Sequence, residues 1–310
     1  MLPWLPATVT ASSLNAPDEL IATELLVDTL IIVKAEAGFV VLLAASLLGG
    51  CGTSSGNLLG NASDLTGNWQ IETSASAASA SPQGVVLMGG LESSGNQVSG
   101  TFRFTNLAQP VACGSNQVVL LSGAVGPDND LTLSSATLPN NTTIRVSLKL
   151  GNAQPYSGLG KVEVDGGSCA VASASAIGSQ VATATGKFVG TLSPGTSGAS
   201  GSGMSGTATA TLTQSATAGS DGQFALTGTL NYQFASCSGS VPLNGKVSGV
   251  GMNFWDVVFT SSGGQVQANL VGTTNLTATQ IKVGYLSLAP APCSADPTSS
   301  AAFNGQMIRK

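Results

Sequence analysis

The sequence predicts an all-β protein made of two similar antiparallel meander units, each a small barrel or sandwich, behind an N-terminal signal segment. Three observations support this prediction. Apolar and polar residues alternate with period two in many short segments, and clusters of Gly, Ser, Asn and Pro separate those segments. Cysteines recur at equal spacing in the two halves of the 310-residue chain. Short strands with one apolar face favour antiparallel meanders that close on themselves.

Composition excludes several classes of function. The chain contains no histidine, so it has neither a Ser-His-Asp or Cys-His mechanism nor a histidine metal site. A formal net charge of −5 provides no basic surface for nucleic acid. With 42% hydrophobic and 8% charged residues, the chain can bury a sizeable core, and its solubility must come from hydroxyl and amide side chains.

The first element, residues 1–50, is predicted to be a signal region. Gly38–Leu48 form an apolar run shorter than the ~20 residues that a spanning helix needs, and the run fits the hydrophobic part of a secretory signal. Residues 1–32 contain no Lys or Arg, whereas a signal sequence should begin with positive charge. We interpret residues 1–32 as an over-extended gene reading; the alternative is an unusually long natural leader.

The second element, residues 51–63, begins at a cysteine. Leu48-Gly49-Gly50-Cys51 resembles a bacterial lipobox, in which the cysteine is diacylated and the signal is cleaved before it. The resemblance implies a lipoprotein signal peptide, a membrane anchor on Cys51 and a place in the bacterial cell envelope. Gly52 in place of Asp resembles the outer-membrane sorting pattern. The alternative is a buried helix with a free cysteine.

The remaining four cysteines predict an internal duplication. Cys113 and Cys169 are 56 positions apart, and so are Cys237 and Cys293. Four cysteines in an oxidising compartment allow three pairings. The simplest pairing places one disulfide inside each unit, Cys113 with Cys169 and Cys237 with Cys293.

Other landmarks repeat in the same frame. Gly67-Asn68-Trp69 opens the first predicted unit, residues 64–180, and Gly186-Lys187-Phe188 opens the second, residues 181–310. The segment VSGTFRF of the first unit corresponds to LTGTLNYQF of the second. The repetition favours a duplication over chance equality of the cysteine spacing.

The strands themselves are predicted by alternation. In residues 143–150, TIRVSLKL, four apolar side chains share one face and the polar side chains share the other. Residues 226–234, LTGTLNYQF, alternate in the same way. Hydroxyl and amide side chains make up the polar face of that second segment: Thr227, Thr229, Asn231 and Gln233.

The opening of the first unit resembles the calycin barrels of the lipocalin and avidin type. Asp64-Leu65-Thr66-Gly67-Asn68-Trp69 and the later VSGTF carry the resemblance. In those families a Gly-x-Trp begins the first strand, and the tryptophan closes one end of an eight-stranded up-and-down barrel. The second unit departs from this pattern, with Phe188 in place of the tryptophan. The whole chain is similar to bacterial lipoproteins, rich in Gly, Ser and Thr, that carry duplicated GxW-type repeats.

Few residues in the two units can carry chemistry. The acidic residues after Cys51 are predicted mostly in turns or on polar strand faces: Asp64, Glu72, Glu92, Asp128, Asp130, Glu163, Asp165, Asp221, Asp256 and Asp296. Asp128-Asn129-Asp130 offers oxygen ligands but lacks the glycine and distal glutamate of a calcium loop, so a hairpin turn is favoured. We predict no enzyme activity, no cofactor and no metal site.

Trp255 and Asp256 are the candidate ligand-binding residues. They lie in FWDVVF, a segment apolar on both faces, and a carboxylate buried there would need a partner or a raised pKa. The alternatives are a core tryptophan and an aspartate at a barrel rim in contact with water.

Two non-enzymatic functions follow from this sequence. We predict a structural or interaction module, held at the membrane through Cys51 and meeting an envelope polymer or a small ligand. The alternative is a calycin-like binding protein for an apolar small molecule or a saccharide. Barrels of this size are commonly filled by side chains, which favours the first function.

Overall fold

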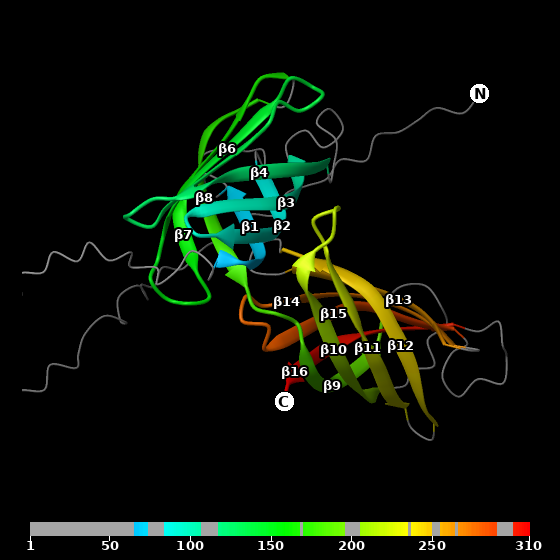
Figure 1. The fold of residues 1–310 in the computed structure, drawn as a ribbon. Helices are drawn as coiled ribbons and strands as arrows, with labels where there is room; N and C mark the ends of the chain where they lie inside the picture. Colours follow the sequence, from blue (N-terminus) through cyan, green and yellow to red (C-terminus); the bar gives the residue numbers. More distant parts are fainter. Residues whose placement is uncertain are drawn as a thin grey trace, which may run out of the picture. The chain divides into compact units, whose positions relative to one another are not determined.

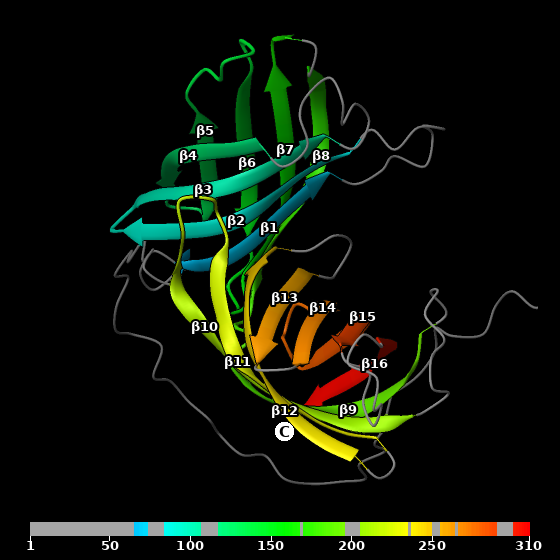
Figure 2. The ribbon, with the colours of Figure 1, turned by 90° about the vertical axis from the view of Figure 1, so that its right-hand side faces the viewer.

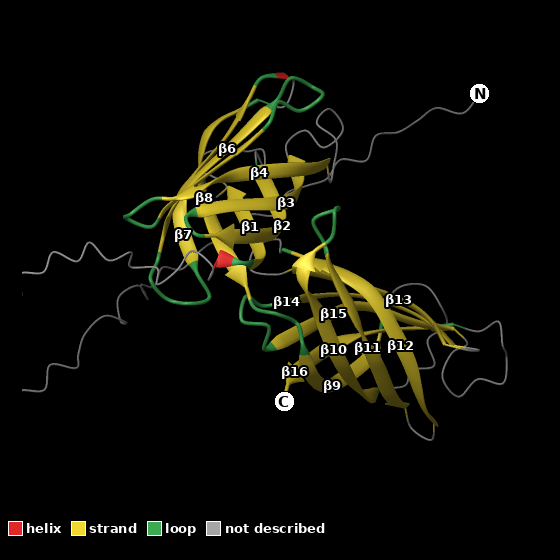
Figure 3. Cartoon of the chain, viewed as in Figure 1, coloured by secondary structure: helices red, strands yellow, loops and turns green. Residues whose placement is uncertain are grey.

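The structure is a computed structural model that describes residues 65–73, 84–106, 117–167, 170–195, 205–234, 237–249, 255–263, 266–289 and 300–310. These residues form strands joined by turns and loops, with short helical turns drawn in red in Figure 3. None of the described segments forms a helix of the length and apolar character that crossing a membrane requires. The predicted signal region and tether, residues 1–63, lie outside the described residues.

The first barrel is a meander of the eight strands β1–β8, drawn from blue to green in Figure 1. Each strand pairs antiparallel with the next, and β8 pairs back with β1, so that Trp69 lies opposite Gln180. The strands are β1 Gly67–Thr73, β2 Val85–Ser94, β3 Gln97–Asn106, β4 Gln117–Val125, β5 Asp130–Ser135, β6 Thr143–Leu150, β7 Ser157–Asp165 and β8 Val171–Val181.

The second barrel repeats this order with the strands β9–β16, drawn from green to red in Figure 2. It closes where β16 pairs with β9, and Phe188 there lies opposite Arg309. The strands are β9 Gly186–Pro194, β10 Gly206–Ala218, β11 Phe224–Phe234, β12 Cys237–Ser248, β13 Trp255–Gly263, β14 Val266–Thr274, β15 Gln280–Ala289 and β16 Ala301–Arg309.

The prediction of an all-β chain with two similar antiparallel units is confirmed, and the units are closed barrels rather than sandwiches. On β6 the apolar residues are buried and the polar residues between them are exposed, as the alternation predicts. On β11, Leu226 and Leu230 are buried while Thr227 and Asn231 are exposed. The period-two pattern places one face of each strand inside the barrel because successive side chains point to opposite sides.

The two barrels also share their strand register. Gly67 at the start of β1 pairs with Leu91, and Gly186 at the start of β9 pairs with Leu212. Both glycines have positive φ, 140° and 150°, a conformation that favours glycine. Leu91 and Leu212 are therefore equivalent positions, and the outward-facing residues of β2–β4 can be compared one by one with those of β10–β12.

Each barrel encloses its own apolar core. All eight strands of the first barrel contribute buried side chains to one continuous cluster, with Trp69, Phe102 and Phe104 as its largest members. The described side chains of the second barrel form a corresponding cluster that contains Phe188, Phe234 and Phe303. The rings of Phe234 and Phe303 stack at 4.3 Å between centroids.

Candidate functional site

One end of the first barrel is closed by Trp69. Its side chain is fully buried, and the indole Nε1 donates a hydrogen bond of 2.7 Å to the carbonyl oxygen of Leu65. Gln180, opposite Trp69 on β8, donates from Nε2 to the carbonyl oxygen of Thr66. Both bonds hold the segment before β1 against the barrel, with the Trp69 ring buried beside it.

At the equivalent end of the second barrel, where β9 begins, lie Phe188 and Arg309. Phe188 is fully buried, and the Arg309 guanidinium lies 5.6 Å from the centroid of its ring. Arg309 also donates from Nη2 to the carbonyl oxygens of Thr183 and Thr185. Thr66 and Thr185 each precede the first glycine of their barrel, so Gln180 and Arg309 bind equivalent carbonyls.

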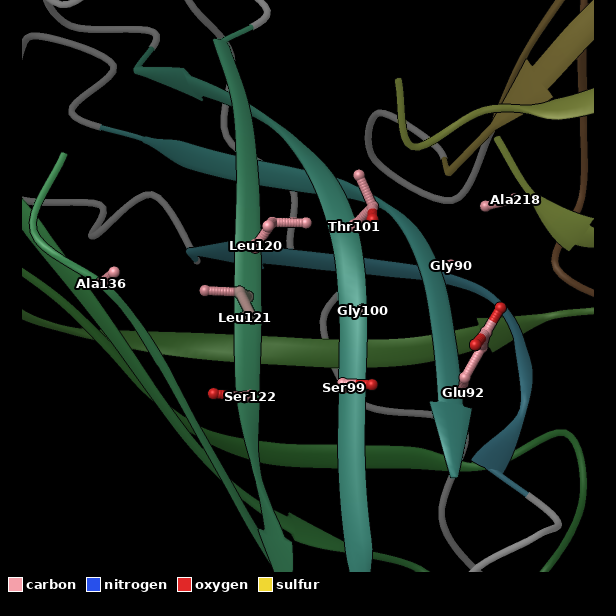
Figure 4. Close-up of a pocket in the computed structure, with 10 residues that line it drawn as sticks. All are labelled: Gly90, Glu92, Ser99, Gly100, Thr101, Leu120, Leu121, Ser122, Ala136 and Ala218. Carbon is pink, nitrogen blue, oxygen red and sulfur yellow. The ribbon is translucent and has the colours of Figure 1, made fainter. Parts of the chain in front are cut away.

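The outer face of β2–β4 in the first barrel is partly apolar (Figure 4). Leu120 on β4 is 69% exposed and lies beside Thr101 on β3. Val118, also on β4, is 43% exposed. Glu92 and Ser99 form the next row toward the end of β2. Figure 4 shows these rows as side chains on neighbouring strands, with a single carboxylate among them.

The equivalent outer face of the second barrel carries hydroxyl and amide groups instead. A hollow of about 470 Å³ lies on this face at the beginning of β10 and β12. Tyr232 and Gly239 border it, together with six outward polar residues: Thr207, Thr209, Asn231, Gln233, Ser238 and Ser240. Burial raises the pKa of the Tyr232 phenol, so this group is a neutral hydroxyl at physiological pH.

Carboxylates on the outer surface of the first barrel form ion pairs. Asp165 lies 3.0 Å from Arg145, and Asp130 lies 3.2 Å from Lys149. Asn129 takes positive φ in the turn between β4 and β5 and donates from Nδ2 to Asn152, so Asp128-Asn129-Asp130 forms a hairpin turn. These carboxylates sit on separate turns and strands, each beside its own cation or turn.

Asp221 pairs with Lys246 beside the turn between β10 and β11. Desolvation by burial acts to raise the pKa of this carboxyl. The hydrogen bonds from Lys246 and from the Gln223 backbone N–H, with the attraction of the ammonium, outweigh it and hold the pKa below its ordinary value.

The candidate residues Trp255 and Asp256 begin β13. Their backbone is paired: Trp255 lies opposite Thr274, and Asp256 lies between Ser248 and Thr273. Their side chains lie outside the described part of the structure.

Of the five cysteines, Cys237 is described as the first residue of β12, where its backbone pairs with Phe234. The other four lie outside the described residues: Cys51, Cys113, Cys169 and Cys293.

The sequence interpretation missed the contact between Arg309 and Phe188. A Gly-x-Phe at the start of the second unit was available as a signal, but nothing in the local sequence links it to an arginine at the end of the last strand. Only the closing register of β16 on β9 brings the two residues together.

Comparisons of the chain with models of known protein families, with curated proteins and with solved structures found no match.

Proposed function

We propose that this chain is a non-catalytic lipoprotein of the bacterial cell envelope, anchored in the outer membrane through lipid on Cys51. Its two barrels act as structural or interaction modules that meet an envelope polymer with their outer faces. The lipobox-like Leu48-Gly49-Gly50-Cys51 supports the anchor. Two acyl chains give stable membrane attachment where one alone is marginal.

The observation that carries the module function is the apolar core of each barrel. Inward side chains of the first barrel pack as one cluster across all strands, and buried Trp69 closes one end. Such an interior stabilises the barrel by burying apolar surface rather than by holding a ligand. Recognition is then left to the outward side chains, which are largely hydroxyls and amides in the second barrel.

A calycin-like binding protein for an apolar small molecule or a saccharide is the second candidate. The closed eight-stranded meander supports it, because barrels of this strand number hold one small ligand in lipocalins and streptavidin. Trp255 and Asp256 remain the candidate ligand-binding residues for this function.

Fractionation of cells tests the proposed function. The full chain is expected in the membrane fraction, and Cys51→Ala is expected in the soluble fraction, whereas the tether variant Ser54→Ala stays membrane-bound. The soluble Cys51→Ala chain is then expected to sediment with insoluble envelope polymer from the same cells. A Cys51→Ala chain that stays fully membrane-bound, or that remains in the supernatant with the polymer, contradicts the proposal.

A further inference from the structure

The outer face of β10, β11 and β12 carries an array of uncharged side chains, all of them polar except that of Pro242. Four outward positions on β10 are all threonine, and the register places each beside an outward residue of β11. Those residues in turn lie beside outward residues of β12. The rows are Thr207–Gln233–Ser238, Thr209–Asn231–Ser240, Thr211–Thr229–Pro242 and Thr213–Thr227–Asn244. We call these residues the β10–β12 array.

The hydrogen-bonding groups of the array are available to a ligand. Among the described residues, no side chain of the array donates or accepts a hydrogen bond within the protein, and most of these side chains are exposed. Neighbouring strands stand about 4.8 Å apart, and successive outward residues on one strand about 7 Å apart. The array therefore presents donors and acceptors at a repeating spacing.

Strand propensity alone does not account for this composition. Threonine is favoured in strands, but asparagine is depleted there, and Asn231 and Asn244 both occupy exposed strand positions. Some property other than the stability of the sheet is needed to explain them.

The first barrel provides an internal comparison. Across β2, β3 and β4, the row Met88, Arg103 and Val118 is equivalent by register to a row of the array. That row of the array contains only hydroxyl and amide side chains: Thr209, Asn231 and Ser240. Because the same scaffold accepts apolar and charged residues at these positions, the fold does not require the polar pattern.

We propose that the β10–β12 array binds a neutral polysaccharide chain. Hydroxyls and carboxamides both donate and accept, which matches the hydroxyl groups of a sugar. The array contains no charge, so it lacks the Arg or Lys that an anionic polymer requires. The hollow of about 470 Å³ at one end has the volume of a small-molecule site, and all the residues that line it are polar apart from Gly239.

Charged residues lie at the edges of the array rather than within it, which is consistent with an uncharged polysaccharide as the partner. Lys187 on β9 lies opposite Thr211, at the edge of the array. Lys246 follows Asn244 along the outer face of β12 and is paired with Asp221, which leaves its charge compensated. This inference rests on the proposed interaction role and specifies the surface and the polymer class.

Native affinity electrophoresis tests the inference. The full chain, held in a polyoxyethylene detergent free of sugar groups, is run in gels that contain dextran, pullulan or hydroxyethyl cellulose. At least one of these neutral polymers is expected to retard it, and anionic polygalacturonate is not. Thr209→Val combined with Asn231→Ala is expected to weaken the retardation at least tenfold. Arg103→Ala, which changes the position equivalent to Asn231 in the first barrel, is expected to leave it unchanged.

The substituted side chains face outward and lie outside the apolar cores, so the variants are expected to fold, and thermal melting within a few degrees of the parent chain checks this. Absence of retardation by all three neutral polymers overturns the inference, and so does equal retardation of the parent and the double variant. If the chain sediments with envelope polymer but the double variant sediments equally well, the proposed function stands and this surface is wrong. If the array binds neutral polysaccharide while Cys51→Ala stays membrane-bound, the inference stands and the proposed anchor is wrong.

Discussion

The two barrels solve the same packing problem with different residues. In the first, the buried indole of Trp69 donates a hydrogen bond to the carbonyl oxygen of Leu65, which is buried in the same cluster. In the second, the phenyl ring of Phe188 carries no N–H group. The Arg309 guanidinium lies over that ring and donates hydrogen bonds to the carbonyl oxygens of Thr183 and Thr185. Strand order and register are retained, while the residues that close the end and cover the outer face differ. The scaffold therefore tolerates exchange at its surface, and we propose that the polar pattern of the second barrel serves recognition.

The largest expected effect is the loss of the ring that closes the first barrel. Trp69→Ala should lower the free energy of unfolding by about 3–5 kcal/mol, because it removes fully buried surface and leaves a cavity. Trp69→Phe, which reproduces the second barrel, should cost about 1 kcal/mol for the lost hydrogen bond. Urea denaturation of both variants measures this, and a cost below 1 kcal/mol for Trp69→Ala would show that Trp69 does not close the barrel.

A substitution at Trp255 distinguishes a packed second barrel from one that contains a binding cleft. Its neighbour Val257 pairs with fully buried Val247, and the alternation of β13 predicts a core role for the tryptophan. Trp255→Ala should then cost about 3–5 kcal/mol. Thermal melts decide between the two functions: an unchanged melting temperature would mean that Trp255 is not core, and would favour the calycin-like binding function.

The disulfides are expected to stabilise both barrels similarly. The segment with Cys113 joins β3 to β4, and the segment with Cys169 joins β7 to β8. Strand direction alternates around the barrel, so β3 and β7 end at the same end. A bridge closing 56 positions contributes about 4 kcal/mol by chain entropy.

Peptide mapping without reduction should therefore recover Cys113 with Cys169 and Cys237 with Cys293. Recovery of Cys169 joined to Cys237 would defeat the model of two independently bridged units.

A smaller effect is expected at the closed end of the second barrel. Arg309→Met keeps the length of the side chain but removes the cation above Phe188 and the bonds to Thr183 and Thr185. The expected loss is about 1–2 kcal/mol. Gln180→Met, the matched change in the first barrel, removes a bond to Thr66 and should cost less. Chemical denaturation compares the two, and an equal cost would mean that the cation on the ring contributes nothing.

The smallest effect is expected from the ion pair of Asp221 and Lys246. Because the pKa of Asp221 is held below its ordinary value, the pair stabilises the fold above that value, and this contribution is lost as the pH falls through the lowered pKa. The contribution of such an exposed pair is about 0.2–1 kcal/mol. Lys246→Met should remove this acid dependence, which unfolding measured between neutral and strongly acidic pH can detect; an unaltered pH profile would contradict it.

The alternation of apolar and polar residues predicted most of the strands, because it indicates which face of each strand is buried. Alternation placed Ile144, Val146 and Leu148 inside the barrel and Asn231 outside it. Closure into a barrel depends on pairing between strands that are distant in the sequence, as where Trp69 of β1 lies opposite Gln180 of β8. The alternation of residues within one strand does not reveal such pairing. The β10–β12 array was visible only in part, because Thr227 and Asn231 were placed on one face but their neighbours across β10 and β12 depend on register.

The central claim is that both barrels are filled and that recognition lies on their outer faces. Native mass spectrometry of the full chain, extracted from its own envelope in mild detergent, tests this claim most directly. The claim predicts the mass of the lipidated polypeptide with no retained small molecule. An apolar compound retained at one equivalent per barrel would contradict it, because such a ligand requires the interior space that the core side chains occupy.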